Sequence, residues 1–205
     1  MTTSRQHRRR SAGAAAVLTG AVLASAAAYA GGLPVWRPDS KCDKDLASYS
    51  LVQNFVMFLP QGYAAPRTDK YKDATRTQIV GAAHADGVKP ILTIWSAPLS
   101  SVPAGEDPLA YGVSVLEKDN QSDGATDYKQ TKPDRGMVGS AAALRFDDTC
   151  RLPAGGAQLP VRGVNYVWVQ GNRLVMASAE DQERSAKDTV PVMEACILSM
   201  TPSGA

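Results

Sequence analysis

The sequence predicts an α+β domain: a mainly antiparallel sheet with one or two helices packed on one face, ending in a β-hairpin followed by a helix. Three features predict that ending. Val164, Tyr166 and Trp168 alternate with their neighbours as in a strand. Gly171-Asn172 then fits a two-residue turn into a return strand over residues 174–179. A helix is predicted next, because apolar residues recur at helical spacing at Ala186, Val190, Met193 and Ile197.

Pro191 lies inside this predicted helix. An interior proline removes one backbone hydrogen bond and kinks a helix. We therefore expect the regular helix to begin only near Asp188.

Residues 1–30 have the layout of an export signal. The first ten residues contain Arg5, Arg8, Arg9 and Arg10 without any acid, and the next twenty carry no charge. That stretch is rich in alanine, which contributes little to bilayer transfer, so cleavage is favoured over a permanent anchor. Ala28-Tyr29-Ala30 offers a small-x-small cleavage site. The alternative is an uncleaved membrane anchor through residues 11–30.

Loss of this segment would reverse the sign of the net charge. The chain has 22 basic and 20 acidic residues, and without the four arginines 18 basic residues remain, a net charge of −2. No basic face is left for nucleic acid, and no lysine-rich amphipathic helix suggests a membrane surface.

Residues 31–42 are rich in glycine and proline. They are expected to connect the export signal to a single domain over residues 43–202, with Trp36 docked on that domain. Within the domain, a short helix over residues 43–50 and a strand through Phe58 are expected first.

The middle of the chain is expected to alternate strands with polar segments. Residues 91–97 have the alternation of a strand, while the run before the Asp86-Gly87 turn fits either a strand or a helix capped by Gly87. Further strands are expected at residues 111–116 and 137–146, and loops at 117–136 and 147–158. The first of these loops has no large aliphatic residue, which makes it the expected working surface.

Three cysteines allow one disulfide and leave one thiol. Cys150 with Cys196 is the predicted pair, because it would join a strand to the final helix. Cys42 with Cys196 is the alternative, since spacing alone does not determine connectivity.

No catalytic set is predicted. His84 is the one histidine outside the export signal, and no nucleophile motif accompanies it, so a solvated turn histidine is expected. The acids are expected to be solvated loop residues, with Glu180 and Asp181 complementing the dipole of the last helix. No cofactor is expected, and Trp95, Tyr166 and Trp168 are expected in the core.

One pattern suggests a metal. Asp119, Gln121, Asp123 and Asp127, with Gly124 at the bend, match the first nine positions of a calcium loop. Gln130 stands where a bidentate glutamate is expected, so a flexible loop is the competing interpretation.

Two segments resemble PsbP-like and LpqN-like extracytoplasmic proteins. These are NFVMFLPQGY, and the GNRLVMAS hairpin that runs into a helix ending CILSM. The resemblance implies a sheet with helices packed on it, in proteins that mostly bind or assist partners. The chain lacks the lipid-attachment cysteine of the lipoprotein members.

These features predict an exported, non-enzymatic binding or accessory domain of the cell envelope, whose partner is an unidentified envelope protein or small ligand. An extracytoplasmic hydrolase that uses scattered carboxylates is the alternative. Membrane contact is expected only through residues 11–30, if they are not cleaved.

Overall fold

The computed structural model describes residues 32–203, except residues 86, 123 and 155. These residues form one compact unit. The predicted export signal over residues 1–30 lies outside them, so cleavage and anchoring stay predictions. Among the described residues, no helix is both long and apolar enough to span a bilayer.

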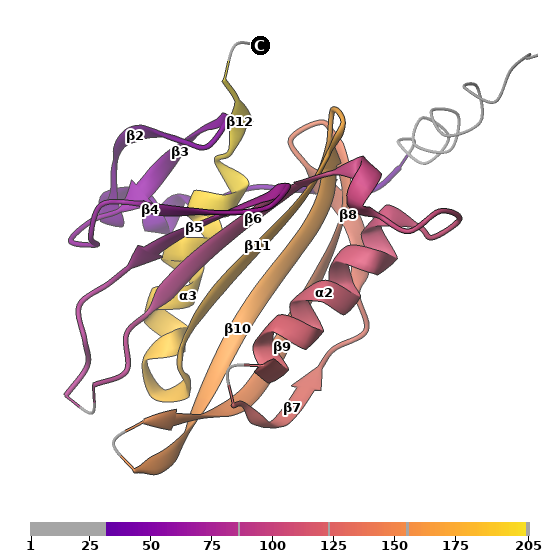
Figure 1. The fold of residues 1–205 in the computed structure, drawn as a ribbon. Coiled ribbons are helices and arrows are strands. Elements are labelled where there is room, and N and C mark those ends of the chain that lie inside the picture. The colour runs from indigo at the N-terminus through magenta and orange to yellow at the C-terminus, as the bar shows by residue number, and fades with distance from the viewer. Residues whose placement is uncertain (1–31, 86, 123, 155, 204–205) are drawn as a thin grey trace, which may run out of the picture. The chain divides into compact units, whose positions relative to one another are not determined.

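A nine-stranded sheet is the centre of the fold (Figure 1). Its strand order is β1-β8-β9-β10-β11-β6-β5-β4, and β7 also pairs with β9. Every pairing is antiparallel except that of β1 with β8. The strands are β1 (Val35–Trp36), β4 (Arg67–Tyr71), β5 (Ala74–Val80), β6 (Ile91–Pro98), β7 (Thr126–Gln130), β8 (Asp134–Val138), β9 (Ala141–Ala154), β10 (Ala157–Gln170) and β11 (Arg173–Gln182).

Two helices, α2 (Pro108–Ser122) and α3 (Glu183–Leu198), accompany this sheet. A smaller sheet has the order β12-β3-β2. The remaining elements are β2 (Leu46–Val52), β3 (Phe55–Pro60), β12 (Thr201–Pro202) and the short 3-10 helices η1 (Ser40–Asp45) and η2 (Leu99–Ser101). The predicted α+β class with a mainly antiparallel sheet is confirmed.

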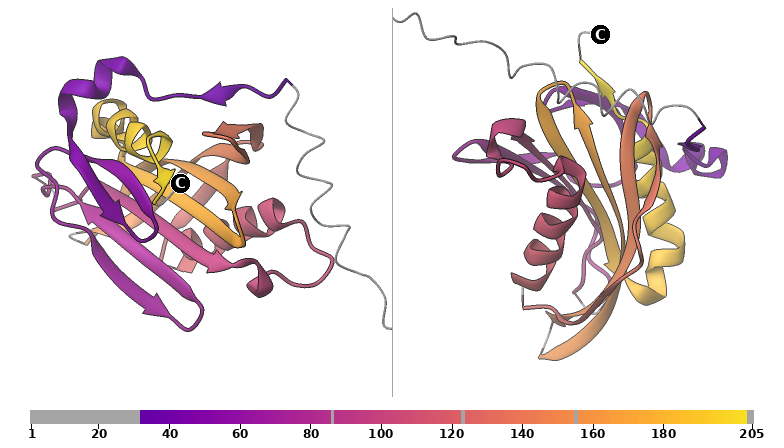
Figure 2. Two further views of the ribbon diagram at one scale, coloured as in Figure 1. Left: turned by 90° about the horizontal axis from the view of Figure 1, so that it is seen from above. Right: turned by 90° about the vertical axis from the view of Figure 1, so that its right-hand side faces the viewer.

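The helices cover opposite faces of the main sheet, not one face as predicted (Figure 2). Alternate residues of each strand face opposite sides, so one strand contributes side chains to the hydrophobic cores on both faces. Trp168, Tyr166 and Ala177 pack with α3 and the small sheet, whereas Val167 and Met176 pack with α2. We call these sides the α3 face and the α2 face.

A glycine allows α2 to approach the sheet closely. A Cβ added to Gly112 would collide with the Val167 side chain of β10. Trp36 of β1 similarly lies over Gly136, where an added Cβ would come within 2.5 Å of the indole. Its ring meets Tyr166 edge-on, with centroids 5.5 Å apart. The predicted connector thus contributes a strand, and Trp36 docks on the domain.

The C-terminal hairpin is confirmed, with residues 164–169 pairing with 174–179 around Gly171. The strand over residues 91–97 is confirmed as β6, and the ambiguous run before it forms a strand, β5. The predicted late start of the last helix is wrong. It begins at Glu183 and continues through Pro191.

Other predicted elements differ from the structure. Residues 43–50 form the end of η1 and most of β2, not an α-helix, and β2 pairs with β3 as a hairpin. The predicted strand over 111–116 belongs to α2, and the predicted loop over 117–136 contains the end of α2, all of β7 and the start of β8. Residues 137–146 span a turn between β8 and β9. The predicted loop over 147–158 is largely the β9–β10 hairpin.

Candidate functional site

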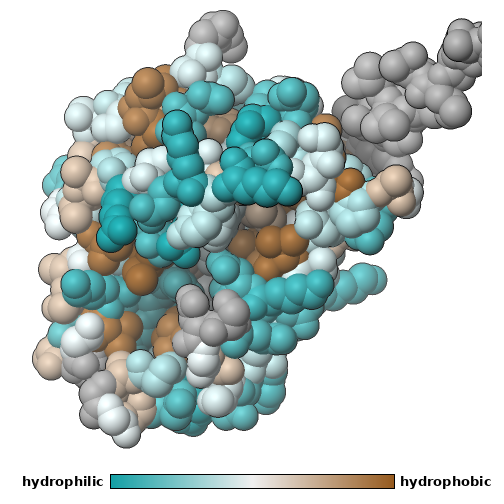
Figure 3. Space-filling view, viewed as in Figure 1, coloured by the Kyte–Doolittle hydropathy of each residue, from teal (hydrophilic) through white to brown (hydrophobic). Residues whose placement is uncertain are grey.

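A groove of about 810 Å³ opens between α2 and strands β5, β6 and β11 on the α2 face. We call it the α2 groove. Figure 3 shows hydrophobic side chains between hydrophilic ones on the side where β6, β11 and α2 are viewed. The α2 groove is lined by residues of the β4–β5 turn, β6, the segment from Ser100 to Val102, α2 and β11.

The groove exists because α2 covers only part of its face. Val113 and Leu116 pack with Leu144, Val167 and Met176, which keeps the helix over β9, β10 and β11. Strands β5 and β4 extend beyond this contact to the sheet edge. The aromatic and aliphatic residues near that edge therefore line an open space.

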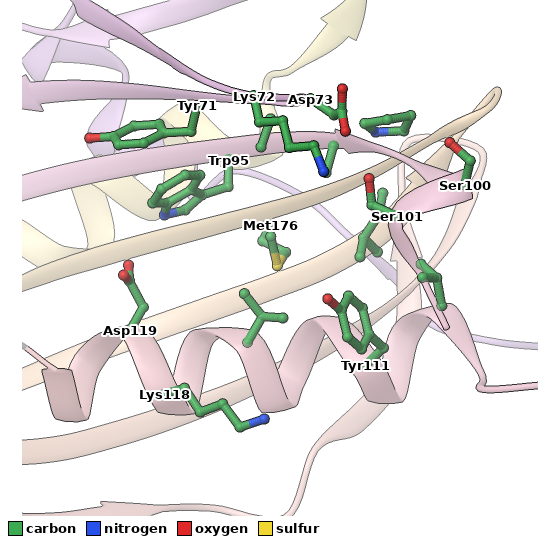
Figure 4. A pocket seen from close by; sticks show the side chains of 16 residues that line it. Tyr71, Lys72, Asp73, Trp95, Ser100, Ser101, Tyr111, Lys118, Asp119 and Met176 are labelled. Atoms are coloured by element: carbon green, nitrogen blue, oxygen red, sulfur yellow. The ribbon is translucent and has the colours of Figure 1, made fainter. Parts of the chain in front are cut away.

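Aromatic side chains form one wall of the groove. The rings of Tyr71 and Trp95 lie 5.3 Å apart, at an interplanar angle of 43°. The guanidinium of Arg76 lies 5.1 Å from the Tyr71 ring and 5.2 Å from the Trp95 ring, within the range of cation–π attraction. Tyr111 of α2 lines the opposite side, with Met176 on the floor (Figure 4).

Charged and hydroxyl side chains form the rim. Lys72 and Asp73 lie in the β4–β5 turn, Ser100 and Ser101 lie in η2, and α2 contributes Lys118 and Asp119. In Figure 4 the Lys72 ammonium points toward the Ser101 side of the groove, whereas the Lys118 ammonium points away from Trp95 and Met176. The groove thus joins an apolar interior to a polar mouth.

A buried polar cluster lies on the same face. Asn120 Nδ2 donates to Asp148 Oδ2 over 2.7 Å, and burial of Asp148 raises the pKa of its carboxyl. The buried amide of Asn165 lies beside this carboxyl and, like Tyr128, opposes the rise of its pKa. Asp148 is therefore a buried carboxyl, not the solvated loop acid predicted from the sequence.

His84 also differs from its prediction, because it is paired and only partly exposed. Its Nε2 lies 2.8 Å from Oδ1 and 2.9 Å from Oδ2 of Asp181. The Asp181 side chain is fully buried and also accepts from Thr189 Oγ1 and the Gln182 amide, both over 2.7 Å. Burial, with the charge of Asp181, raises the pKa of Tyr63 to about 12. Asp181 lies beside the start of α3 as predicted, but inside the protein.

A second polar cluster lies on the α3 face. Glu194 Oε1 accepts from Arg145 Nε over 2.9 Å and from the Tyr166 hydroxyl over 2.6 Å. Burial of Tyr166 raises the pKa of its phenol, as does the charge of Glu194. A small pocket of about 180 Å³ adjoins this cluster.

The predicted calcium residues do not share one loop. Asp119 and Gln121 lie in the last turns of α2, and Asp127 lies in β7, 3.5 Å from Arg151 Nε. Asp123 is outside the described residues. No three His, Cys, Asp or Glu side chains in the described part of the chain are grouped to hold a metal ion.

All three cysteines are free thiols. The predicted bond between Cys150 and Cys196 is absent, because strand alternation places Cys150 on the α2 face while Cys196 belongs to the core of the α3 face. Burial raises the pKa of Cys196 to about 12 and that of Cys150 to about 11. The alternative partner, Cys42, is buried in η1, which packs against α3.

Tyr166 and Trp168 lie in the core as predicted, but Trp95 does not, because it lines the groove. Tyr71, Lys72 and Tyr111 also line the groove, although the sequence did not predict them there. One signal was available: Tyr71 is a lone aromatic residue in the polar run TDKYKD.

No protein-family model matches the sequence, and no curated protein sequence matches it. Among solved structures, CyanoP, the cyanobacterial PsbP of Synechocystis sp. PCC 6803, is similar with a TM-score of 0.50 and 10% identity, over 80% of this chain and 89% of CyanoP. The resemblance to PsbP-like proteins is thus confirmed for the fold.

Two further structures have lower TM-scores. LpqN of Mycobacterium tuberculosis, described as involved in cell envelope biogenesis, has a TM-score of 0.39 and 10% identity over 83% of this chain and 99% of LpqN. A protein of unknown function from Pseudomonas aeruginosa has a TM-score of 0.43 and 7% identity over 77% of this chain and 98% of its own.

Proposed function

We propose that this chain is an exported, non-enzymatic binding domain of the cell envelope, and that its ligand occupies the α2 groove. One observation carries the proposal: a cavity of about 810 Å³ with aromatic and aliphatic walls and a polar rim. Small-molecule sites have this size and this mixture of side chains. The charge layout of residues 1–30 supports export.

The groove is suited to a ligand with an apolar part. Tyr71, Trp95 and Tyr111 offer rigid ring surfaces that lose little conformational freedom on binding. Met176 is an adaptable floor residue, because its unbranched side chain accommodates different shapes. Burial of a ligand's apolar surface against these side chains would drive association.

A hydrolase is the second candidate, and one observation favours it. Asp73 and Asp119 both line the groove, and a glycosidase needs two carboxylates across a cleft. Figure 4 shows them at different ends of the groove, with Asp73 on the side of Ser100 and Asp119 below Trp95. Binding without turnover is the better supported function.

Filling the groove tests the binding function. The neutral fluorophore N-phenyl-1-naphthylamine should bind the protein and brighten, because its emission rises in apolar surroundings. Val115→Trp adds bulk on the helix side of the groove and should weaken binding about tenfold or more. Ala97→Trp does so from the sheet side.

Ala110→Trp is the matched control, because it adds the same side chain to an exposed position of α2. It should bind the fluorophore as the unmodified chain does, and thermal melts will show which variants are folded. Equal binding by the control and by both folded groove variants would contradict the proposal.

Turnover of 4-nitrophenyl glycosides tests the second candidate. We expect none from the unmodified chain. Hydrolysis that disappears in both Asp73→Asn and Asp119→Asn, while the fold is kept, would establish the hydrolase and overturn the non-enzymatic assignment.

A further inference from the structure

We infer that the ligand of the α2 groove is an amphipathic molecule with one anionic headgroup, which binds with its apolar body against the aromatic wall and its headgroup beside Lys72. This inference rests on the proposed function and names the class of ligand.

The apolar half of the site is continuous. Leu174 and Met176 form the floor, and Val115 and Tyr111 of α2 face the wall made by Trp95. Leu174 and Met176 are almost fully buried, while Trp95 is only partly so. An aliphatic or ring-shaped body placed here would cover the remaining exposed surface of these side chains.

Among the residues that the structure describes, Lys72 is the cation best placed at the mouth of the groove. Lys72 makes no ion pair with any residue that the structure describes, and its ammonium points into the groove near Ser101 (Figure 4). Lys118 points away. Arg76 is already placed over two rings and lies 3.9 Å from Asp69.

Neighbouring groups refine this picture. Ser100 and Ser101 are exposed and carry hydroxyl donors for an anion beside Lys72. Asp73 lies next to Lys72 and opposes an anionic ligand by like-charge repulsion. The site therefore attracts an acid modestly, and removal of the Asp73 charge should strengthen that attraction.

Two matched probes test the inference on the full chain. 11-(Dansylamino)undecanoic acid has an apolar body and one carboxylate, and its methyl ester lacks the charge. In low salt the acid should bind about two- to fivefold more tightly than the ester, the range expected for one solvent-exposed charge pair. Added sodium chloride should reduce the difference in affinity between acid and ester, because salt screens the attraction between Lys72 and the carboxylate.

Single substitutions test whether Lys72 causes the preference for the acid. Lys72→Gln should remove the preference for the acid, so that acid and ester bind with the same affinity. Lys118→Gln, the matched control on the same rim, should keep the preference, and Asp73→Asn should widen it.

The outcomes separate this inference from the proposed function. Equal binding of acid and ester by the unmodified chain, or a preference unaffected by Lys72→Gln, overturns the anionic headgroup but leaves the groove as a binding site. Failure of both probes to bind, or binding that Val115→Trp and Ala97→Trp do not weaken, overturns the proposed function itself.

Discussion

The two faces of the main sheet are built from the same strands, yet only one of them is fully covered. On the α3 face, helix α3 and the small sheet together enclose Trp168 and Tyr166, each 1% exposed. On the α2 face, a single helix covers the central strands and leaves Trp95 at an open groove. Coverage by neighbouring elements, not strand composition, decides whether an aromatic residue is enclosed in the core or lines an open groove.

Each face also holds a buried acid in a different setting. Asp181 on the α3 face receives three donors, from His84, Thr189 and the Gln182 amide. Asp148 on the α2 face accepts from Asn120, and burial raises its pKa although side-chain hydrogen bonds from Asn165 and Tyr128 act in the opposite direction.

Truncating one tryptophan on each face should give the largest difference in stability between the two faces. Trp168→Ala should lower the free energy of unfolding by about 3–5 kcal/mol, because it leaves a large cavity in a closed core. Trp95→Ala should cost only about 1 kcal/mol, since that side chain is partly exposed, but it should weaken fluorophore binding. Urea denaturation measures both, and equal losses of stability would contradict the comparison.

Removing His84 tests how much its pairing with Asp181 on the α3 face contributes to stability. His84→Ala deletes one donor to the fully buried Asp181 carboxylate and should destabilise the fold by about 1–3 kcal/mol at pH 7. Glu183→Ala, at an exposed position two residues after Asp181, is the control and should change the unfolding midpoint little. An unchanged midpoint for His84→Ala would show that the pair contributes nothing to stability.

Neutralising the acid of the α2 face should have the smallest effect and the opposite sign. Because the pKa of Asp148 is raised in the folded state, its contribution to stability is full below the unfolded pKa and is lost as pH rises through the folded pKa. Asp148→Asn should therefore be more stable than the unmodified chain at pH 7 and similar to it at pH 3. Unfolding curves across this range measure the difference, and a variant less stable at pH 7 would contradict it.

The sequence predicted those elements of the fold that neighbouring residues determine on their own. The hairpin over residues 164–179 has strict alternation and a Gly171 turn, so its two strands were recognisable. Helix α2 was missed because Tyr111, Val113 and Val115 alternate like a strand, while the polar end after Leu116 suggests a loop. Packing of Val113 and Leu116 on the sheet selects the helix instead.

The β9–β10 hairpin was missed for another reason. Pro153 and Gly156 suggest a loop between residues 147 and 158, and Pro160 follows directly. The prolines are tolerated because they lie near the tip of a long hairpin, where Pro153 pairs with Gln158 and Pro160 with Arg151.

The groove could not be predicted, because its lining comes from segments that are distant in sequence. Tyr71, Trp95 and Met176 become neighbours only through the pairing of β4, β5, β6 and β11. The same is true of His84 and Asp181, which are 97 positions apart. No local spacing rule connects such residues.

The place of β4 at the edge of the sheet has a kinetic consequence. Its backbone is bonded to β5 alone, so its amide hydrogens can exchange with solvent by local opening, without separation of either core. Tyr71 and Lys72 belong to this hairpin. Local opening of the hairpin would therefore displace one side of the α2 groove on a timescale independent of global unfolding.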